Sequence, residues 1–474
     1  MDIQNFKIWL TNSEKYSIKT VENIISRIQR VNRFKKIDMN EDIDLYLLIL
    51  SKNGKFKMLS SSVKSQLRKA VRLYYQFNEE YLIIDNCNQK NGKFRILSLF
   101  ANVGVAEALL RDINVEVVVA NELVQRRALL YSEIYPKTKV FCGDITDSEV
   151  YGKVIDTSIK NNVDIIMATP PCQGMSTVGQ QLKNDERNRL IIPVVQATLD
   201  IHPKYVFIEN VPMLLKTGIN VEGENILILD YLKQKLGDKY TLEYKIINTM
   251  NYDVPQSRER VIFLLTRKDV SEKWKFPKKS SHIISMAEAI GDIPEIDPFI
   301  KDITLDEMKE IFPEYEIKKK RALSISKWNI PPEHVKRQVI AMMHTPTGKT
   351  AFDNKKYIPV KADGTPVKGY KNTYKRQNWD TPAYTITMDN RKISSQNNVH
   401  PGRFKGYDST GEVIYSDPRT LTLYELMRLS TLPDDWNLPE KTSEAFLRRV
   451  IGEGIPPLFV KKVFEMITRR NING

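Results

Sequence analysis

A short apolar run that ends at two adjacent prolines restricts this chain more than any other feature. Residues 163–168 (Val-Asp-Ile-Ile-Met-Ala) have the length and composition of a buried parallel strand. Pro170 and Pro171 then block both a helix start and a continuing ladder of hydrogen bonds. Cys172 follows directly, so we expect it at the carboxyl end of a strand, where open α/β sheets bind their ligands. A thiol in that place is a candidate nucleophile, although a lone cysteine is more often a small buried hydrophobe.

The segment from Lys93 to Leu265 repeats short apolar runs separated by turn-rich or amphipathic stretches. The first run is expected to lead into a helix at 106–110. Besides the strand at 163–168, strands are expected at 94–100, which is this first run, and at 115–120, 139–142, 205–208 and 260–265. This alternation of strands and helices is typical of nucleotide-binding parallel sheets, so we predict an α/β fold with a Rossmann-like sheet.

Three positions in this segment suit a nucleotide ligand. Gly104, in the turn after the first strand, permits close approach of a ligand to the backbone. Glu122 at the tip of the second strand can hold ribose hydroxyls, and Asp144 after the third can accept from an adenine amino group. A strand and turn with one glycine is common in α/β proteins, so this pattern alone does not identify the ligand.

Several short sequence motifs follow one another between residues 93 and 474. They are Pro-Pro-Cys-Gln at 170–173, Phe-Ile-Glu-Asn-Val at 207–211, Gln-Ser-Arg-Glu-Arg at 256–260, and a late block with Arg-Thr-Leu-Thr at 419–422, Glu425, Arg428 and Leu-Pro-Asp-Asp-Trp at 432–436. Each string alone could occur by chance. Together, in this order, they resemble the DNA (cytosine-5)-methyltransferases of prokaryotic restriction-modification systems.

The resemblance implies a catalytic set. Cys172 corresponds to the nucleophile that adds to C6 of cytosine, which makes C5 reactive towards a methyl donor. Glu209 corresponds to the carboxyl group that acts at N3, and Asn210 to a residue that positions the site. Arg258 and Arg260 are expected to bind O2 of the base and to orient Glu209.

The resemblance also implies S-adenosylmethionine as the cofactor. No metal is expected, because the five histidines are scattered and none lies at metal-ligand spacing with a cysteine. Asn102 replaces a glycine of the family and is expected to keep the turn, because asparagine tolerates left-handed backbone angles. Val105 replaces another and fits only if its φ is negative. Glu453 replaces the asparagine that usually contacts the methionine end of the cofactor, and it is expected at the corresponding position. The expected cofactor-binding residues are Phe100, Ala101, Asn102, Val103, Gly104, Glu122, Leu123, Asp144, Ile145, Pro171 and Glu453.

The domain organisation follows from composition and pattern. Residues 1–90 form a helical module with 16 Lys+Arg against 10 Asp+Glu, in which Ser61 and Ser62 offer a helix cap. This module loosely resembles the amino-terminal core-binding domain of tyrosine recombinases and is a possible DNA clamp; a plain solvated charged face is the alternative. Residues 93–266 are the catalytic and cofactor-binding domain, 267–400 a smaller, irregular target-recognition domain, and 401–474 the return to the catalytic domain, with a helix at 451–467.

Residues 318–376 contain 15 Lys+Arg and 3 Asp+Glu, in a chain with 72 Lys+Arg and 58 Asp+Glu. Aromatic residues and glycines are interleaved with these charges. Such a stretch suits phosphate contacts combined with groove readout, so double-stranded DNA is the expected partner. The stretch 173–190 is expected to be a mobile active-site loop.

The remaining composition bounds the setting. Cys87, Cys142 and Cys172 form no paired framework, and no long apolar run occurs, so we expect a monomeric cytoplasmic protein without membrane contact. We also expect functional pairing with a restriction endonuclease. The alternatives are a tRNA cytosine-5 methyltransferase, a non-catalytic DNA-binding homologue, and an adenosylmethionine-dependent enzyme acting on small molecules; the last would not need the excess positive charge.

Overall fold

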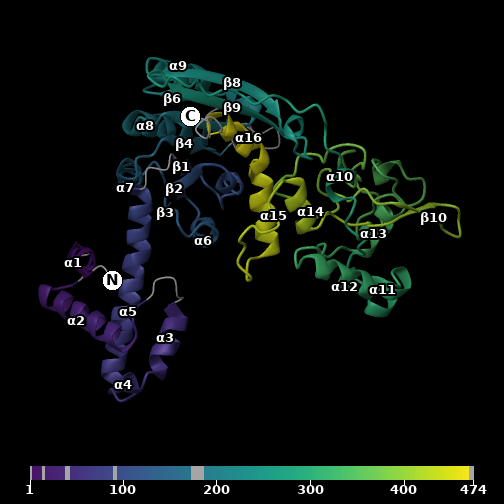
Figure 1. Ribbon diagram of the computed structural model, residues 1–474. Helices are drawn as coiled ribbons and strands as arrows, with labels where there is room; N and C mark the ends of the chain where they lie inside the picture. Colours follow the sequence, from purple (N-terminus) through teal and green to yellow (C-terminus); the bar gives the residue numbers. More distant parts are fainter. Residues whose placement is uncertain (1–2, 13–15, 38–42, 89–92, 172–185, 469–474) are drawn as a thin grey trace. The chain divides into compact units, whose positions relative to one another are not determined.

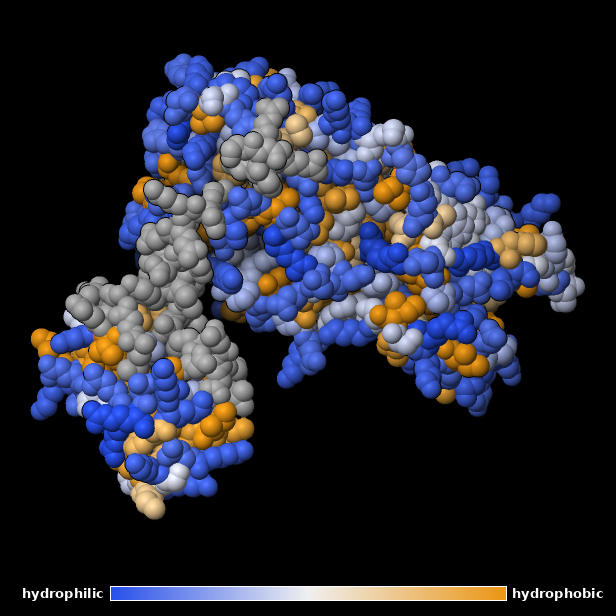
Figure 2. All heavy atoms as spheres, in the orientation of Figure 1, coloured by the Kyte–Doolittle hydropathy of each residue, from blue (hydrophilic) through white to orange (hydrophobic). Residues whose placement is uncertain are grey.

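The computed structural model describes residues 3–12, 16–37, 43–88, 93–171 and 186–468 (Figure 1). The chain divides into two compact units, Met1–Asn91 and Gly92–Gly474. Hydrophilic residues cover most of the surface visible in Figure 2, and hydrophobic residues form small patches between them. Within the described ranges, no helix is both long and apolar enough to cross a membrane.

The first unit is helical, as predicted. Its helices are α1 (Ile3–Asn12), α2 (Ile18–Phe34), α3 (Ile43–Lys52), α4 (Gly54–Lys57) and α5 (Ser61–Asn88). The apolar face of α2 is buried against α5, and the Phe6 ring of α1 packs edge-on against Tyr74 of α5, with the ring centroids 5.0 Å apart. The predicted cap is corrected by one residue, because the hydroxyl oxygen of Ser60 accepts from the N–H of Val63.

The second unit is built on a seven-stranded sheet, which confirms the predicted α/β class. Its strand order is β3-β2-β1-β4-β5-β9-β8. The first five strands in this order, from β3 through β2, β1 and β4 to β5, are parallel to one another. Strand β9 is antiparallel to both of its neighbours, β5 and β8. The strands are β1 (Phe94–Leu99), β2 (Val115–Glu122), β3 (Lys139–Cys142), β4 (Ile165–Ala168), β5 (Tyr205–Asn210), β8 (Tyr240–Asn248) and β9 (Glu259–Arg267).

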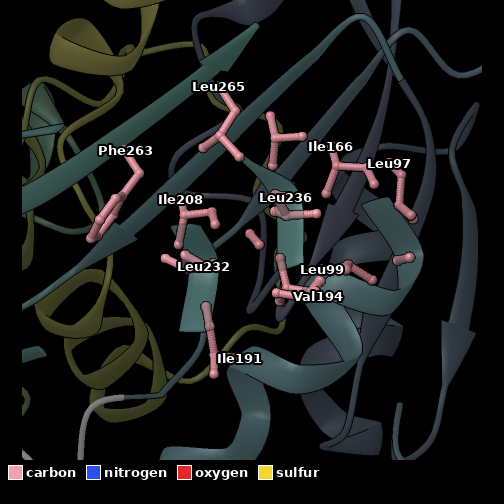
Figure 3. Close-up of a cluster of buried hydrophobic side chains, with 14 of the residues drawn as sticks. Leu97, Leu99, Ile166, Ile191, Val194, Ile208, Leu232, Leu236, Phe263 and Leu265 are labelled. Atoms are coloured by element: carbon pink, nitrogen blue, oxygen red, sulfur yellow. The ribbon is translucent and has the colours of Figure 1, made fainter. Parts of the chain in front are cut away.

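Helices cover both faces of the sheet. Apolar side chains of α7 (Ser148–Lys160), α8 (Ile191–Ile201) and α9 (Ile228–Leu236) pack on one face, where Leu232, Ile208 and Phe263 lie together (Figure 3). On the other face α16 (Pro457–Thr468) packs Phe464 against Phe207, with ring centroids 5.7 Å apart. The last helix of the described chain therefore covers one face of a sheet that earlier segments form.

Two helix predictions need correction. Residues 106–109 form turns and Leu110–Asp112 a 3-10 turn, in place of the helix predicted at 106–110. The predicted helix at 451–467 is interrupted: α15 (Glu444–Glu453) ends before Pro456, and α16 begins at Pro457. A proline lacks the N–H of an interior helical residue but fits the first turn.

The segment after β9 is mostly irregular, and the alternation of strands and helices ends there, as predicted. It contains α10 (Met286–Ile290), α11 (Leu305–Ile311), α12 (Tyr315–Ile325), α13 (Lys336–Met343) and the hairpin β10 (Phe404–Tyr407) with β11 (Val413–Tyr415). A ring nitrogen of His344, at the end of α13, lies 2.8 Å from the carbonyl oxygen of Val413. The hairpin thus packs with this segment although it follows the expected boundary at residue 400. The helix α14 (Leu423–Leu429) comes after it.

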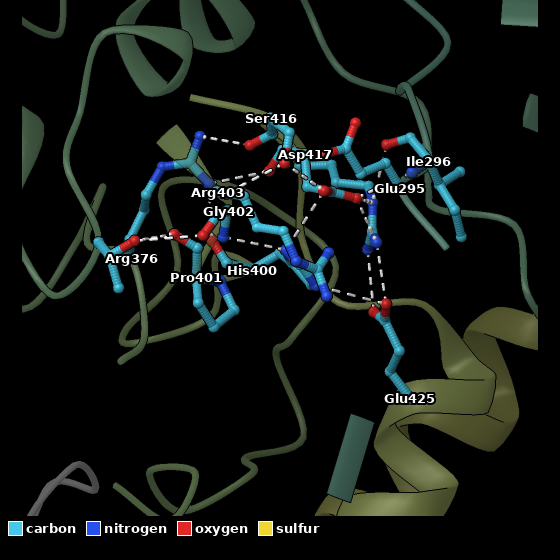
Figure 4. A network of polar contacts seen from close by, with 12 residues as sticks. Glu295, Ile296, Arg376, His400, Pro401, Gly402, Arg403, Ser416, Asp417 and Glu425 are labelled. Atoms are coloured by element: carbon cyan, nitrogen blue, oxygen red, sulfur yellow. Dashed lines mark hydrogen bonds and ion pairs between the residues drawn. The ribbon is translucent and has the colours of Figure 1, made fainter. Parts of the chain in front are cut away.

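A buried polar network stabilises this irregular part (Figure 4). The Arg419 guanidinium lies 2.8 Å from carboxylate oxygens of both Asp417 and Glu425, and all three side chains are fully buried. Arg376 donates to carbonyl oxygens of Met342, His400, Ser416 and Asp417. Burial alone would raise the pKa of Glu425, but Arg419 holds it below its usual value. Irregular backbone lacks the hydrogen-bond ladder of a sheet, so the buried arginine satisfies carbonyl groups that would otherwise have no donor.

Candidate active site

The carboxyl ends of the parallel strands bring most of the predicted site residues to one edge of the sheet. In the strand registers, Leu99 of β1 is paired with Ala168 of β4, and Ala168 with Ile208 of β5. The residues that follow each strand are therefore neighbours. Because β9 is antiparallel to β5, the start of β9 lies at the same edge.

The turn after β4 is fixed by its neighbours on both sides. The Thr169 hydroxyl donates to the carbonyl oxygen of Phe100 at 3.1 Å, and the Asn210 amide donates to that of Pro170 at 3.0 Å. Asn210 thereby ties the end of β5 to the approach to Cys172. Cys172 itself, and the predicted active-site loop up to residue 185, lie outside the described residues. Pro171, a predicted cofactor contact, is half-buried at the end of this turn.

Glu209 and Arg260 form an ion pair at this edge. The Nε of Arg260 lies 2.8 Å from Oε1 of Glu209, and their side chains are 14% and 11% exposed. Glu209 is paired with Ile262 across β5 and β9, so Arg260 is its diagonal neighbour on the same face. The pairing of β5 with β9 thus brings the Arg260 guanidinium to the Glu209 carboxylate. The pair is largely buried yet lies beside the proline turn.

The structure places Arg258 elsewhere. Its terminal nitrogens donate to the carbonyl oxygens of Ile386 and Glu453, both at 3.0 Å, and the side chain is buried. These contacts join the start of β9 to the irregular domain and to the end of α15. In this structure the ion pair with Glu209 is formed by Arg260.

The turn after β1 has the backbone that its sequence requires. Asn102 adopts a φ of 51° and Gly104 a φ of 78°, and an added Cβ at Gly104 would lie 2.1 Å from the Tyr135 ring. The Glu122 carboxylate accepts from the N–H of Asn102 at 2.9 Å and of Val124 at 2.8 Å. Burial raises the pKa of Glu122, and these hydrogen bonds and a nearby arginine oppose that rise.

The departures from the family pattern contact one another or a new partner. Val105 has a negative φ, as required, and packs against Gly454, where an added Cβ would lie 2.6 Å from it. The Asn102 amide donates to the carbonyl oxygen of Val450 in α15 at 3.2 Å. Glu453 pairs with Arg127 at 2.8 Å, where α6 (Gln125–Ile134) begins. The residues that replace the family's glycines and asparagine thus all lie where the β1 turn meets the end of α15, and each has a contact there.

The other predicted cofactor positions surround this turn. Ala101, Val103 and Ile145 are buried, whereas Leu123 is 62% exposed. Phe100 has a φ of 59°. Asp144 uses one carboxylate oxygen to accept from the backbone and hydroxyl of Thr146, at 2.9 and 2.8 Å. No group of three or more His, Cys, Asp or Glu side chains within the described ranges is arranged to hold a metal ion.

Sequence reasoning missed a buried carboxyl group behind the β1 turn. Glu107 is 4% exposed and accepts from the Ser98 hydroxyl at 2.7 Å and from the Tyr131 hydroxyl at 3.5 Å. Burial raises the pKa of Glu107 to about 7. Its only sequence signal was a glutamate within an apolar run. Arg127 was missed as well, because only the fold brings α6 to Glu453.

We expect Glu107→Gln to stabilise the protein at alkaline pH. The unfolded carboxyl has a pKa of 4.5 and the folded one a pKa of about 7, so the folded state binds more protons between these values and loses stability as pH rises. The neutral amide removes this loss, which is worth about 3 kcal/mol near pH 8 and about 1 kcal/mol near pH 5. Calorimetric melting at both pH values, with exposed Glu243→Gln as control, checks this. An equal shift in melting temperature at both pH values would contradict it.

Comparison with known proteins identifies the family. The profile described as C-5 cytosine-specific DNA methylase matches residues 94–469. The chain belongs to this family. The type II methyltransferase M1.HgaI of Avibacterium volantium is 40% identical over 380 residues, which are 79% of this chain and 98% of that protein. M.XorII of Xanthomonas oryzae pv. oryzae, also a type II methyltransferase, is 25% identical over 377 residues, 77% of this chain and 82% of that protein.

The solved structures agree on the fold. A candidate DNA modification methyltransferase encoded within an E. coli prophage superposes with a TM-score of 0.54 at 18% identity, over 81% of this chain and 100% of that chain. The resemblance deduced from the motifs is therefore confirmed: this chain is a member of the C-5 cytosine-specific DNA methylase family. The family match begins at residue 94, so the helical first unit lies outside it.

Proposed function

We propose that this methyltransferase uses S-adenosylmethionine to methylate C5 of a flipped-out cytosine in a specific duplex sequence, through transient addition of Cys172 to C6. The observation that carries the proposal is the shared edge of the sheet. There the Glu209–Arg260 pair, the proline turn that leads to Cys172 and the Asn102–Glu122 turn follow neighbouring strands.

The β1 turn suits the cofactor. Oδ1 of Asn102 is buried and has no hydrogen-bond partner among the described residues, so an acceptor stands ready at the carboxyl end of β1. The Glu122 oxygens each accept one N–H and retain lone pairs for ribose hydroxyls. Asp144 and Ile145 follow β3 at the same edge, where they would contact the adenine. S-adenosylmethionine, when bound, supplies the methyl group.

The protein residues divide the chemistry between nucleophile and acid. The Cys172 thiolate forms a bond to C6 while Glu209 delivers a proton to N3, so that the electrons of the C5–C6 double bond become available at C5. Arg260 holds the Glu209 carboxyl in place and offers donors to O2 of the base. After methyl transfer a base removes the C5 proton and the thiolate leaves, which restores the double bond. These atoms are stacked inside duplex DNA, so the cytosine must be extruded first.

We assign DNA recognition to the irregular domain, extended to include the β10–β11 hairpin. Arg376 does not contribute a phosphate contact, because it is fully buried in the polar network. Other cations of the basic stretch are accessible: Lys355 and Lys356 are exposed, and the Lys371 side chain is 83% exposed.

We expect neutralisation of four lysines of the basic stretch to weaken DNA binding and leave cofactor affinity unchanged. Each lysine that binds a phosphate in the unaltered protein should, when neutralised, lower the slope of log affinity against log salt by roughly one. Anisotropy titrations of labelled DNA over a range of salt concentrations measure the DNA affinity and the salt slope. An unchanged slope would contradict the assignment. The variant replaces Lys355, Lys356, Lys371 and Lys375 by glutamine. The matched control replaces four exposed lysines of α7 and α9, namely Lys153, Lys160, Lys233 and Lys235.

Bisulfite sequencing of a plasmid that carries the gene tests the proposed reaction. Protection of one cytosine within a recurring sequence is expected, and that sequence is the one a paired restriction endonuclease should cut. Parallel assays on duplex DNA and tRNA with labelled S-adenosylmethionine should show transfer to duplex DNA alone. Transfer to tRNA alone would reject the proposed DNA substrate.

A further inference from the structure

The helical first unit separates its charges in an unusual way. Residues 27–37 contain five Lys+Arg, residues 52–77 contain seven, and neither stretch contains an Asp or Glu. Like charges without carboxylates between them repel in the folded unit, so such a face favours a polyanionic partner.

Packing brings the two basic stretches to the same side of the unit. The rings of Phe34 at the end of α2 and Phe56 in α4 lie 6.3 Å apart, edge to face. The Asn53 amide donates to the carbonyl oxygen of Phe34 at 2.9 Å and its own oxygen caps α4. The end of α2 and the whole of α4 are therefore fixed to each other by an aromatic contact and a hydrogen bond.

Two guanidinium groups flank this aromatic pair. Arg30 lies over the Phe34 ring at 5.9 Å and Arg68 of α5 over the Phe56 ring at 5.7 Å. Both side chains are exposed. Packing on a ring restricts a guanidinium, so less freedom is lost when it binds a phosphate. We call basic face the surface around this pair, which consists of Arg27, Arg30, Lys55, Lys57, Lys64 and Arg68.

We infer that the basic face binds the phosphate backbone of duplex DNA outside the methylated site and adds sequence-independent affinity. The reasons are its charge, the absence of Asp and Glu from residues 27–37 and 52–77, and its position outside the family match, which leaves the catalytic residues to the second unit. The inference rests on DNA as the substrate of the family and not on the covalent mechanism proposed above.

The test is the affinity of the full-length protein for a labelled duplex of arbitrary sequence, measured by anisotropy across a potassium chloride series. The patch variant is Lys55→Gln/Lys57→Gln. The matched control is Lys7→Gln/Lys19→Gln, in the same unit; both residues are exposed, and Lys19 lies about 16 Å along α2 from Arg30. A second variant, Lys55→Arg/Lys57→Arg, retains the charges.

We expect the patch variant to bind at least about tenfold more weakly at low salt, with the salt slope lower by roughly two, while the control and the arginine variant stay near the unaltered protein. Equal Kd values and slopes for the patch variant and the control would overturn the inference. So would loss of binding to anionic phosphatidylserine vesicles with DNA binding unchanged. Methylation at saturating DNA should continue in every variant. Its absence from the unaltered protein would reject the proposed reaction instead and leave the binding result standing.

Discussion

Replacing Cys172 by serine is expected to abolish methyl transfer and to leave cofactor and DNA affinity within a few fold. A hydroxyl is nearly isosteric with a thiol but far less ionised near neutral pH, so addition to C6 should fail while binding persists. Turnover should fall by at least about a thousandfold in single-turnover assays with labelled cofactor.

Cys87→Ser is the matched control, because Cys87 lies in α5, outside the family match. This variant should keep the rate of the unaltered enzyme. A Cys172→Ser enzyme with a near-normal rate would remove Cys172 from its assigned role. A variant that lost cofactor affinity together with activity would point to a structural function of the residue.

Replacing Glu209 by glutamine is expected to lower kcat by about a hundredfold to ten-thousandfold with little change in KM for DNA. The amide keeps the shape of the carboxyl but cannot deliver a proton to N3. It also removes the charge that pairs with Arg260 at 2.8 Å. Single-turnover rates at saturating cofactor measure the effect.

Glu243→Gln, on the exposed side of β8, is the control for loss of one carboxylate from the same sheet. It should leave both constants unchanged. A Glu209→Gln enzyme that lost DNA affinity and kept kcat would show that the carboxyl group binds DNA and takes no part in proton transfer.

The sheet and its ligand edge were predictable because local pattern determines them. Apolar runs bounded by turn residues specify strands such as β3, and prolines 170 and 171 specify where β4 ends. The strand β8 was not predicted. It is an edge strand of the sheet, and most of its residues are exposed or half-buried. It therefore lacks the continuous apolar run that marks the central strands.

The candidate site was predictable as a set of residues but not as a set of contacts. The motif Gln256–Arg260 offers two arginines two positions apart, and only the antiparallel register of β9 on β5 shows that Arg260 meets Glu209 while Arg258 binds backbone carbonyls. The pairing of Glu453 with Arg127 joins residues more than 300 positions apart. No local pattern carries such a contact, since it depends on α15 returning to the β1 turn.

The buried network of the irregular domain shows the same limit. Arg376 stands at the end of the basic stretch, yet its side chain binds four carbonyl oxygens in the interior. Net charge indicates a polyanion-binding region, but it does not say which cations reach solvent. Burial decides that, and burial follows from the tertiary fold.

The most direct test of the central claim is trapping with duplex DNA that carries 5-fluorocytosine. Fluorine at C5 blocks the final proton loss, so the enzyme should remain bonded to C6 after methyl transfer. In the presence of S-adenosylmethionine we predict a complex that survives denaturation, and mass spectrometry of its peptides should place the bond on Cys172. Absence of such a complex with an enzyme that methylates ordinary duplex DNA, or a bond to another residue, would contradict covalent catalysis by Cys172.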